Sequence, residues 1–207
     1  MKPAFSDLPN SNEFHLSTLD PGGTIGWTYF IVDIHAFTRP ENKVLRYIKS
    51  WECGEFSGDE RKQLESTAAL IYRMQSAAPF SRATMLAEDF ELTQLIGGKN
   101  LLSPVRINAV AEWECWRRGI KFQLQARQMR TSVTPVRLRK FGFEGSWSTS
   151  GKGKDAFAAM QHAIVYLRRL KQESAKHPWK LSRRDALNDH WDCACYERKP
   201  CDLLHPV

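Results

Sequence analysis

The 207-residue sequence lacks several features that mark membrane and secreted proteins. No hydrophobic run approaches the roughly 18 residues that a membrane span requires, so we expect no membrane partner. The first residues include Asp7 and Glu13 and no apolar core, so we expect no secretion signal. Cysteine is scarce and odd in number, with 5 residues. This excludes a regular disulfide framework and favours the reducing cytoplasm.

Acidic side chains are also in deficit. The sequence has 23 Asp and Glu against 30 Lys and Arg, which gives a formal net charge of +7. An excess of positive charge favours a polyanionic partner, of which nucleic acid is the first candidate. A solvated basic protein without such a partner is the alternative.

The hydrophobic patterns predict one domain over residues 14–171, between an irregular arm (1–13) and a basic, cysteine-containing tail (172–207). We expect strands at 14–20, 26–34, 43–52, 83–87 and 120–124, and helices at 57–75, 104–118 and 155–171. Trp113 and Trp116 are expected mostly on the inward side of the second helix, and residues 126–154 are expected to be a long loop. The order predicts an α/β protein with a mixed five-stranded sheet: a three-strand antiparallel meander, two parallel strands and flanking helices.

Three carboxylates stand at the ends of these elements. Asp20 ends the first strand before a Pro-Gly-Gly turn, Glu88 follows the fourth strand, and Asp155 opens the last helix. If the fourth strand lies parallel beside the first, Asp20 and Glu88 lie at neighbouring carboxyl ends, where open α/β sheets place their sites. Converging carboxylates would bind Mg²⁺, or Mn²⁺ in its place, and so support phosphodiester hydrolysis. Taken singly, each acid has a structural alternative: a turn residue, a solvated strand end and a helix cap.

Three segments of the chain resemble a known family. Leu19-Asp20-Pro21-Gly22-Gly23-Thr24-Ile25-Gly26-Trp27 is similar to the first strand and turn of RuvC-like Holliday-junction resolvases, which are ribonuclease H-like proteins. Ala87-Glu88-Asp89-Phe90 is similar to the second acidic motif of that family, and the segment from Asp155 to Ala163 to its final acid-bearing helix. The resemblance covers about residues 14–171 and is nearest to the RuvC-like proteins that bacteriophages encode.

The resemblance implies a crossover-junction endonuclease that uses Mg²⁺ to hydrolyse branched DNA, usually as a homodimer. Asp20, Glu88 and Asp155 would then be catalytic metal ligands. The family has a further Asp or His three residues before the last acid, where this chain has Lys152. Lys152 could contact phosphate instead and so act in catalysis, or the missing ligand could come from elsewhere. The candidates for that ligand are Asp89, Glu91 and His162, although a packed or solvent-facing helix histidine is the commoner role for His162.

Basic residues gather between the fifth strand and the last helix. The candidate DNA-binding residues are Arg127, Arg130, Arg137, Arg139, Lys140 and Lys154. Phe141, Phe143 and Trp147 are interleaved with them and could stack on unpaired bases, or could belong to the core beneath a basic surface. No base-reading motif is present, so we expect recognition of DNA shape and backbone.

Two other functions remain open at this stage. A non-catalytic branched-DNA-binding protein is favoured by Lys152, and an actin-like ATP-binding protein by the Asp-Pro-Gly-Gly turn, although the latter needs a longer, two-lobed chain. In the tail, Cys193, Cys195, Cys201 and His205 could hold zinc. Their spacing matches no common structural zinc site, and free thiols are the alternative.

Overall fold

Five strands form one mixed sheet, in the order β3-β2-β1-β4-β5. The structure, a computed structural model, describes residues 12–38, 46–78, 82–90, 103–144 and 147–176. The strands are β1 (Glu13–Asp20), β2 (Ile25–Asp33), β3 (Ile48–Phe56), β4 (Ala83–Asp89) and β5 (Lys121–Ala126). The pairs β1–β2 and β2–β3 are antiparallel, whereas β1–β4 and β4–β5 are parallel. This is the mixed five-stranded sheet, with a three-strand antiparallel meander and two parallel strands, that the sequence predicts.

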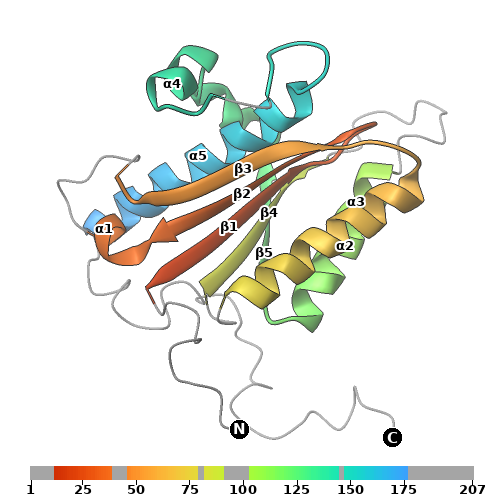
Figure 1. The fold of residues 1–207 in the computed structure, drawn as a ribbon, viewed down its shortest axis with the longest axis horizontal. Helices are drawn as coiled ribbons and strands as arrows, with labels where there is room; N and C mark the ends of the chain where they lie inside the picture. The colour runs from red at the N-terminus through yellow and green to blue at the C-terminus, as the bar shows by residue number, and fades with distance from the viewer. Residues whose placement is uncertain (1–11, 39–45, 79–81, 91–102, 145–146, 177–207) are drawn as a thin grey trace, which may run out of the picture.

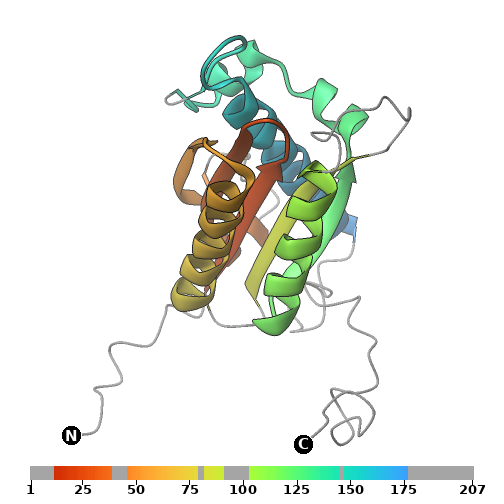
Figure 2. The ribbon, with the colours of Figure 1, turned by 90° about the vertical axis from the view of Figure 1, so that its right-hand side faces the viewer.

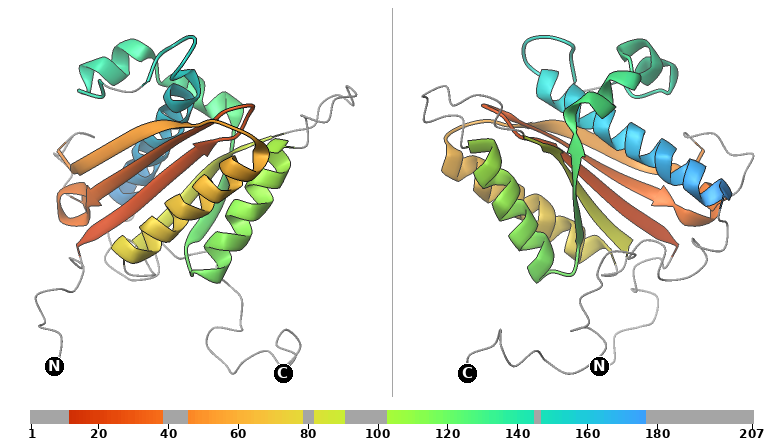
Figure 3. Two further views of the ribbon diagram at one scale, coloured as in Figure 1. Left: turned by 45° about the vertical axis from the view of Figure 1, so that its right-hand side comes forward. Right: turned by 180° about the vertical axis from the view of Figure 1, so that it is seen from behind.

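Helices cover both faces of the sheet. They are α1 (Ile34–Thr38), α2 (Glu60–Ala77), α3 (Ser103–Arg117), α4 (Pro135–Lys140) and α5 (Lys154–Lys176), with the 3-10 helix η4 (Arg127–Ser132) after β5. Figure 1 shows α5 behind the strands and α2 and α3 in front of them, and the view from behind in Figure 3 shows α5 crossing the sheet. In Figure 2, α2 and α3 lie side by side, as their contacts require. No helix among the described residues is long and apolar enough to cross a bilayer.

The period-2 alternation of the strands decides which residues face α5. On β1, Phe14 and Leu16 belong to the core beneath α5, whereas Leu19 belongs to the core beneath α2 and α3. On β4, Leu86 lies on the α5 side and Met85 on the other. Because side chains alternate along a strand, Asp20 of β1 and Glu88 of β4 project to the α5 side.

The third strand lies later in the chain than the pattern 43–52 suggests, because β3 runs from Ile48 to Phe56. Its ladder with β2 continues to the pair Ile25–Phe56 instead of stopping near Glu52. Gly54 does not break the strand, because the ring of Trp27 occupies the space over it: a Cβ there would lie 3.0 Å from Trp27 Cζ2. The extension adds Glu55 to the sheet.

The segment 126–154 is not one long loop, because it contains η4 and α4. Its apolar residues Val133, Leu138 and Phe143 are buried against α5 and the sheet. Phe143 packs edge-on against Phe30 in the core, which excludes stacking on bases and supports the core role that the sequence left open. Trp147 packs against Phe157 and donates its indole N–H to the carbonyl oxygen of Phe143, 2.7 Å away. The aromatic residues therefore fix the basic segment to the domain.

Candidate carboxylate site

Asp20 and Glu88 meet at the carboxyl end of the sheet. The β1–β4 register pairs Leu19 with Ala87, so these acids follow on adjacent parallel strands. A single guanidinium nitrogen joins them: Arg130 Nη1 donates to Glu88 Oε2 at 2.6 Å and to Asp20 Oδ1 at 3.2 Å. The three side chains are largely buried, and that of Arg130 is 17% exposed. Arg130 comes from η4, so the basic segment reaches into the site.

Asp155 lies at the start of α5, where that helix crosses β2 and β3. Its backbone N–H donates to Glu55 Oε1 at 3.0 Å, so the β3 carboxylate satisfies a helix N-terminal donor. Gly26 on β2 lies directly beneath the carbonyl of Asp155, leaving no room for a Cβ. Further along, Thr18 Oγ1 donates to the carbonyl oxygen of Ala159 at 2.7 Å. These contacts fix the first turns of α5 over the strands that carry the other acids.

Burial and mutual repulsion govern the charges of the acids. Burial, reinforced by the negative charges of Glu88 and Asp155 and opposed by Arg130, raises the pKa of Asp20 to about 7. Burial also acts to raise the pKa of Glu88, but the hydrogen bond with His162 and the charge of Arg130 hold it below its ordinary value. Burial and the nearby Glu55, opposed by Lys154, raise the pKa of Asp155. Among these acids, the charged form of Asp20 is therefore the one that a nearby cation would stabilise most.

His162 lies on α5, is buried against the sheet and contacts Glu88. Its Nε2 donates to Glu88 Oε2 at 2.9 Å, and its Nδ1 lies 2.6 Å from Gln125 Oε1. Gln125 is the β5 neighbour of Glu88 in the sheet register. His162 is therefore packed, and its polar contacts fix the orientation of the Glu88 carboxylate.

The donor set suits a hard divalent cation, because carboxylate oxygens are the ligands such ions prefer. A positive charge already lies where the two buried carboxylates meet, because Arg130 contacts both Asp20 and Glu88. Within the described part of the chain, no three His, Cys, Asp or Glu side chains form a group that could hold a metal ion as they stand. Binding of one ion by Asp20, Glu88 and Asp155 together would therefore require these side chains to rearrange.

The remaining candidates lie around this centre or outside it. Lys152 is exposed between Gly151 and Gly153, both with positive φ, directly before α5. Asp89 ends β4, one residue after Glu88, so the strand alternation directs it to the other face. Glu91 and the cysteines and histidines of the tail lie outside the described residues.

The predicted DNA-binding residues divide into two groups. Arg130 is directed into the acidic site, whereas the others are exposed: Arg127, Arg137, Arg139, Lys140 and Lys154. The side chain of Arg127 is 73% exposed, with its Nε 3.7 Å from Glu88 Oε1. Arg139 lies over the ring of Trp147 at 5.7 Å from its centroid. Of the exposed residues, Arg127 lies next to a carboxylate of the site.

Sequence reasoning missed Glu55 as part of the site and the contact of Gly26 with Asp155, and it assigned Arg130 to the DNA surface. A longer predicted third strand would have included Glu55, which is the register partner of Gly26. For Gly26, the available signal was its position in the same turn motif as Asp20. The sequence carries no signal that separates Arg130 from the neighbouring basic residues.

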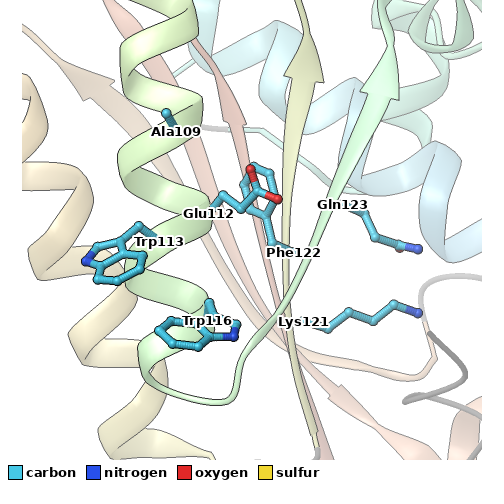
Figure 4. A pocket seen from close by; sticks show the side chains of 7 residues that line it. All are labelled: Ala109, Glu112, Trp113, Trp116, Lys121, Phe122 and Gln123. Carbon is cyan, nitrogen blue, oxygen red and sulfur yellow. The ribbon is translucent and has the colours of Figure 1, made fainter. Parts of the chain in front are cut away.

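A shallow pocket of about 460 Å³ lies between α3 and β5, lined by residues other than the three acids. Trp113 and Trp116 line it and stack with ring centroids 5.0 Å apart (Figure 4). They are 56% and 49% exposed, so the expectation that they face inward is wrong. They lie off the face of α3 that carries the buried Ala111 and Cys115, and they line the pocket beside the edge strand β5.

No protein-family model matches the chain, and no curated protein matches its sequence. Among solved structures, RuvC of Thermus thermophilus aligns with 10% identity and a TM-score of 0.49, covering 75% of this chain and 96% of that one. T. thermophilus RuvC in complex with Holliday junction substrate aligns with 10% identity and a TM-score of 0.48, with the same coverage. At these values the alignments do not bear on activity, which rests on the carboxylate geometry.

Proposed function

We propose that this protein is a divalent-metal-dependent endonuclease that hydrolyses phosphodiesters of branched DNA. The observation that carries the proposal is the pair of buried acids, Asp20 and Glu88, at the carboxyl end of a ribonuclease H-like sheet. A third acid, Asp155, lies close enough to raise the pKa of Asp20. Burying like charges is unfavourable unless positive charge accompanies them, and acids with perturbed pKa values cluster at functional sites.

Asp20, Glu88 and Asp155 would hold Mg²⁺, or Mn²⁺ in its place. When bound, such ions activate a water molecule and stabilise the leaving oxygen of a phosphodiester. His162 orients the Glu88 carboxylate through its Nε2, and Glu55 fixes the first turn of α5 beneath Asp155. Arg127, Arg137, Arg139, Lys140 and Lys154 would bind phosphates on either side of the cleaved bond, and Lys152 would contact the phosphate at the site.

The preference for branched DNA and the action as a homodimer rest on the sequence resemblance, as does a cytoplasmic site of action in a bacterial or phage-infected cell. The resemblance lies in the three motifs that carry Asp20, Glu88 and Asp155. The test uses three DNA substrates of equal length: a four-way junction, a flap and a linear duplex. We expect Mg²⁺-dependent cleavage of the branched substrates and little cleavage of the duplex. Equal cleavage of all three substrates would support the proposed nuclease activity and contradict the proposed preference for branched DNA.

A second candidate is a branched-DNA-binding protein without catalytic activity. Arg130 favours it, because a guanidinium already neutralises the two buried acids in the way a structural ion network would. This alternative predicts junction binding at low salt and no cleavage in Mg²⁺ or Mn²⁺. The same three-substrate assay, with binding measured in parallel, separates the two candidates.

A further inference from the structure

We propose that Arg130 is a positioning residue that occupies the cation site between Asp20 and Glu88, and that a divalent ion must displace it to bind. The inference rests on the proposed function, since it takes these acids as ligands of the ion. It concerns a residue that the resemblance does not assign to the metal site, and it explains how the acids remain together without a metal.

The geometry carries the first step. Arg130 Nη1 contacts Glu88 Oε2 at 2.6 Å and Asp20 Oδ1 at 3.2 Å, so one nitrogen lies between one oxygen of each acid. A divalent ion shared by the same two oxygens needs contacts of about 2.0–2.6 Å to each. The nitrogen and the ion therefore compete for one position, and their like charges add to the exclusion.

The second step is that Arg130 can leave. The guanidinium of Arg130 hydrogen-bonds to the two acids. Because the side chain of Arg130 is 17% exposed, it has a path to solvent. η4, which carries it, has no buried residues and no side-chain cap. Although its Met129 packs beside α5, a six-residue 3-10 helix with no buried residue can move more readily than the central strands that carry the acids.

Arg127 offers a matched comparison on the same helix. Its Nε lies 3.7 Å from Glu88 Oε1, and its side chain is 73% exposed. It therefore shares the charge and the neighbourhood of Arg130 but not the position between the acids. An effect specific to position 130 separates displacement from a general change in local charge.

The experiment measures Mn²⁺ binding by titration calorimetry, without DNA, to the wild type, Arg130→Gln and Arg127→Gln. Melting temperatures are recorded in EDTA and in Mn²⁺. We expect Arg130→Gln to bind Mn²⁺ at least about tenfold more tightly, because no cation has to be displaced. The same variant should melt at a lower temperature in EDTA, and Mn²⁺ should raise that temperature by more than it does in the wild type. Arg127→Gln, which removes a nearby positive charge but not the group between the acids, should gain much less affinity than Arg130→Gln.

If Arg130→Gln does not fold, Arg130→Lys provides the test. Lysine keeps the positive charge, but its shorter side chain ends in a compact ammonium that bridges two acids less well than a guanidinium does. The affinity of this variant for Mn²⁺ should then exceed that of the wild type. An unchanged or weaker affinity in the position-130 variant, with Mn²⁺ still bound by the wild type, overturns the inference and leaves the proposed function intact. An absence of Mn²⁺ binding in all variants overturns both.

Discussion

Gly26 lies beneath the backbone carbonyl group of Asp155, so close that no Cβ fits between them. A Cβ at Gly26 would overlap that carbonyl and lie 2.7 Å from Ala156 N. Gly26 has a strand position without positive φ, so the requirement for glycine here is steric. The contact links the turn motif that carries Asp20 to the helix that carries Asp155.

Gly26→Ala should therefore displace the start of α5 and separate Asp155 from the other acids. Misplacement of a reacting group by about 1 Å can cost on the order of 100-fold in rate, so we expect a loss of that size in cleavage. Gly23→Ala is the control in the same turn, because nothing lies within 4 Å of its added Cβ. Single-turnover cleavage rates and melting temperatures check both variants. Equal rates in the two would show that α5 tolerates the shift.

Asp20→Asn should abolish cleavage and leave DNA binding intact or stronger, because one negative charge facing phosphate is lost. It should also stabilise the metal-free protein. The pKa of Asp20 is raised to about 7 in the folded state, so folding retains a proton that the unfolded chain releases near its ordinary pKa of about 3.9. The contribution of Asp20 to stability therefore falls as the pH rises from about 4 to about 7.

The stability difference between Asp20→Asn and the wild type should accordingly grow with pH over that range and level off above about pH 7. Each kcal/mol gained corresponds to roughly 2–4 °C in melting temperature for a domain of this size. Denaturant titrations in EDTA at several pH values provide the measurement. A stability difference that does not depend on pH would contradict the raised pKa.

Neutralising Arg137, Arg139 and Lys140 together should weaken binding to all DNA sequences about equally. Each lost phosphate contact should reduce the slope of log affinity against log salt by about 0.9 for duplex DNA. The control neutralises three exposed basic residues of α2 and α3, on the other face of the sheet: Arg61, Lys62 and Arg106. Equal losses in both triple variants would mean that net charge, and not the α4 surface, determines binding.

Lys152 stands where the family pattern has an acid or histidine, and it is exposed directly before α5. Lys152→Ala should lower the cleavage rate at saturating DNA by about tenfold to a hundredfold, the size of one lost electrostatic stabiliser. Lys152→Asp should make the rate more dependent on Mg²⁺ concentration without destroying it. Unchanged rates and metal curves in both variants would make Lys152 a solvated loop residue without a role.

The sequence predicts that Asp20 and Glu88 lie side by side, because each stands at the end of a regular strand. Alternation along the strands and their parallel pairing then determine the face of the sheet on which the two acids lie. The same reasoning failed for Glu55. The strand seemed to end before Gly54, and only the packing of Trp27 over that glycine shows that the ladder continues. Local pattern cannot reveal a strand end that a distant side chain decides.

Arg130 and Phe143 show a second limit. Both lie in a segment without apolar periodicity, which predicts a loop with basic and aromatic residues facing DNA. In the structure Phe143 is buried and Arg130 is directed to the acids. Which member of a basic cluster faces inward depends on η4 and α4 packing against α5, and that long-range contact leaves no trace in residue spacing.

The measurement that tests the central claim most directly is single-turnover cleavage of a four-way junction in Mg²⁺ by the wild type, Glu88→Gln and Glu65→Gln. Glu88 is buried in the site, whereas Glu65 is an exposed acid of α2 paired with Arg61. We expect cleavage by the wild type and Glu65→Gln and none by Glu88→Gln, with all three proteins folded and binding the junction. Cleavage by Glu88→Gln at the wild-type rate would contradict the assignment of the site.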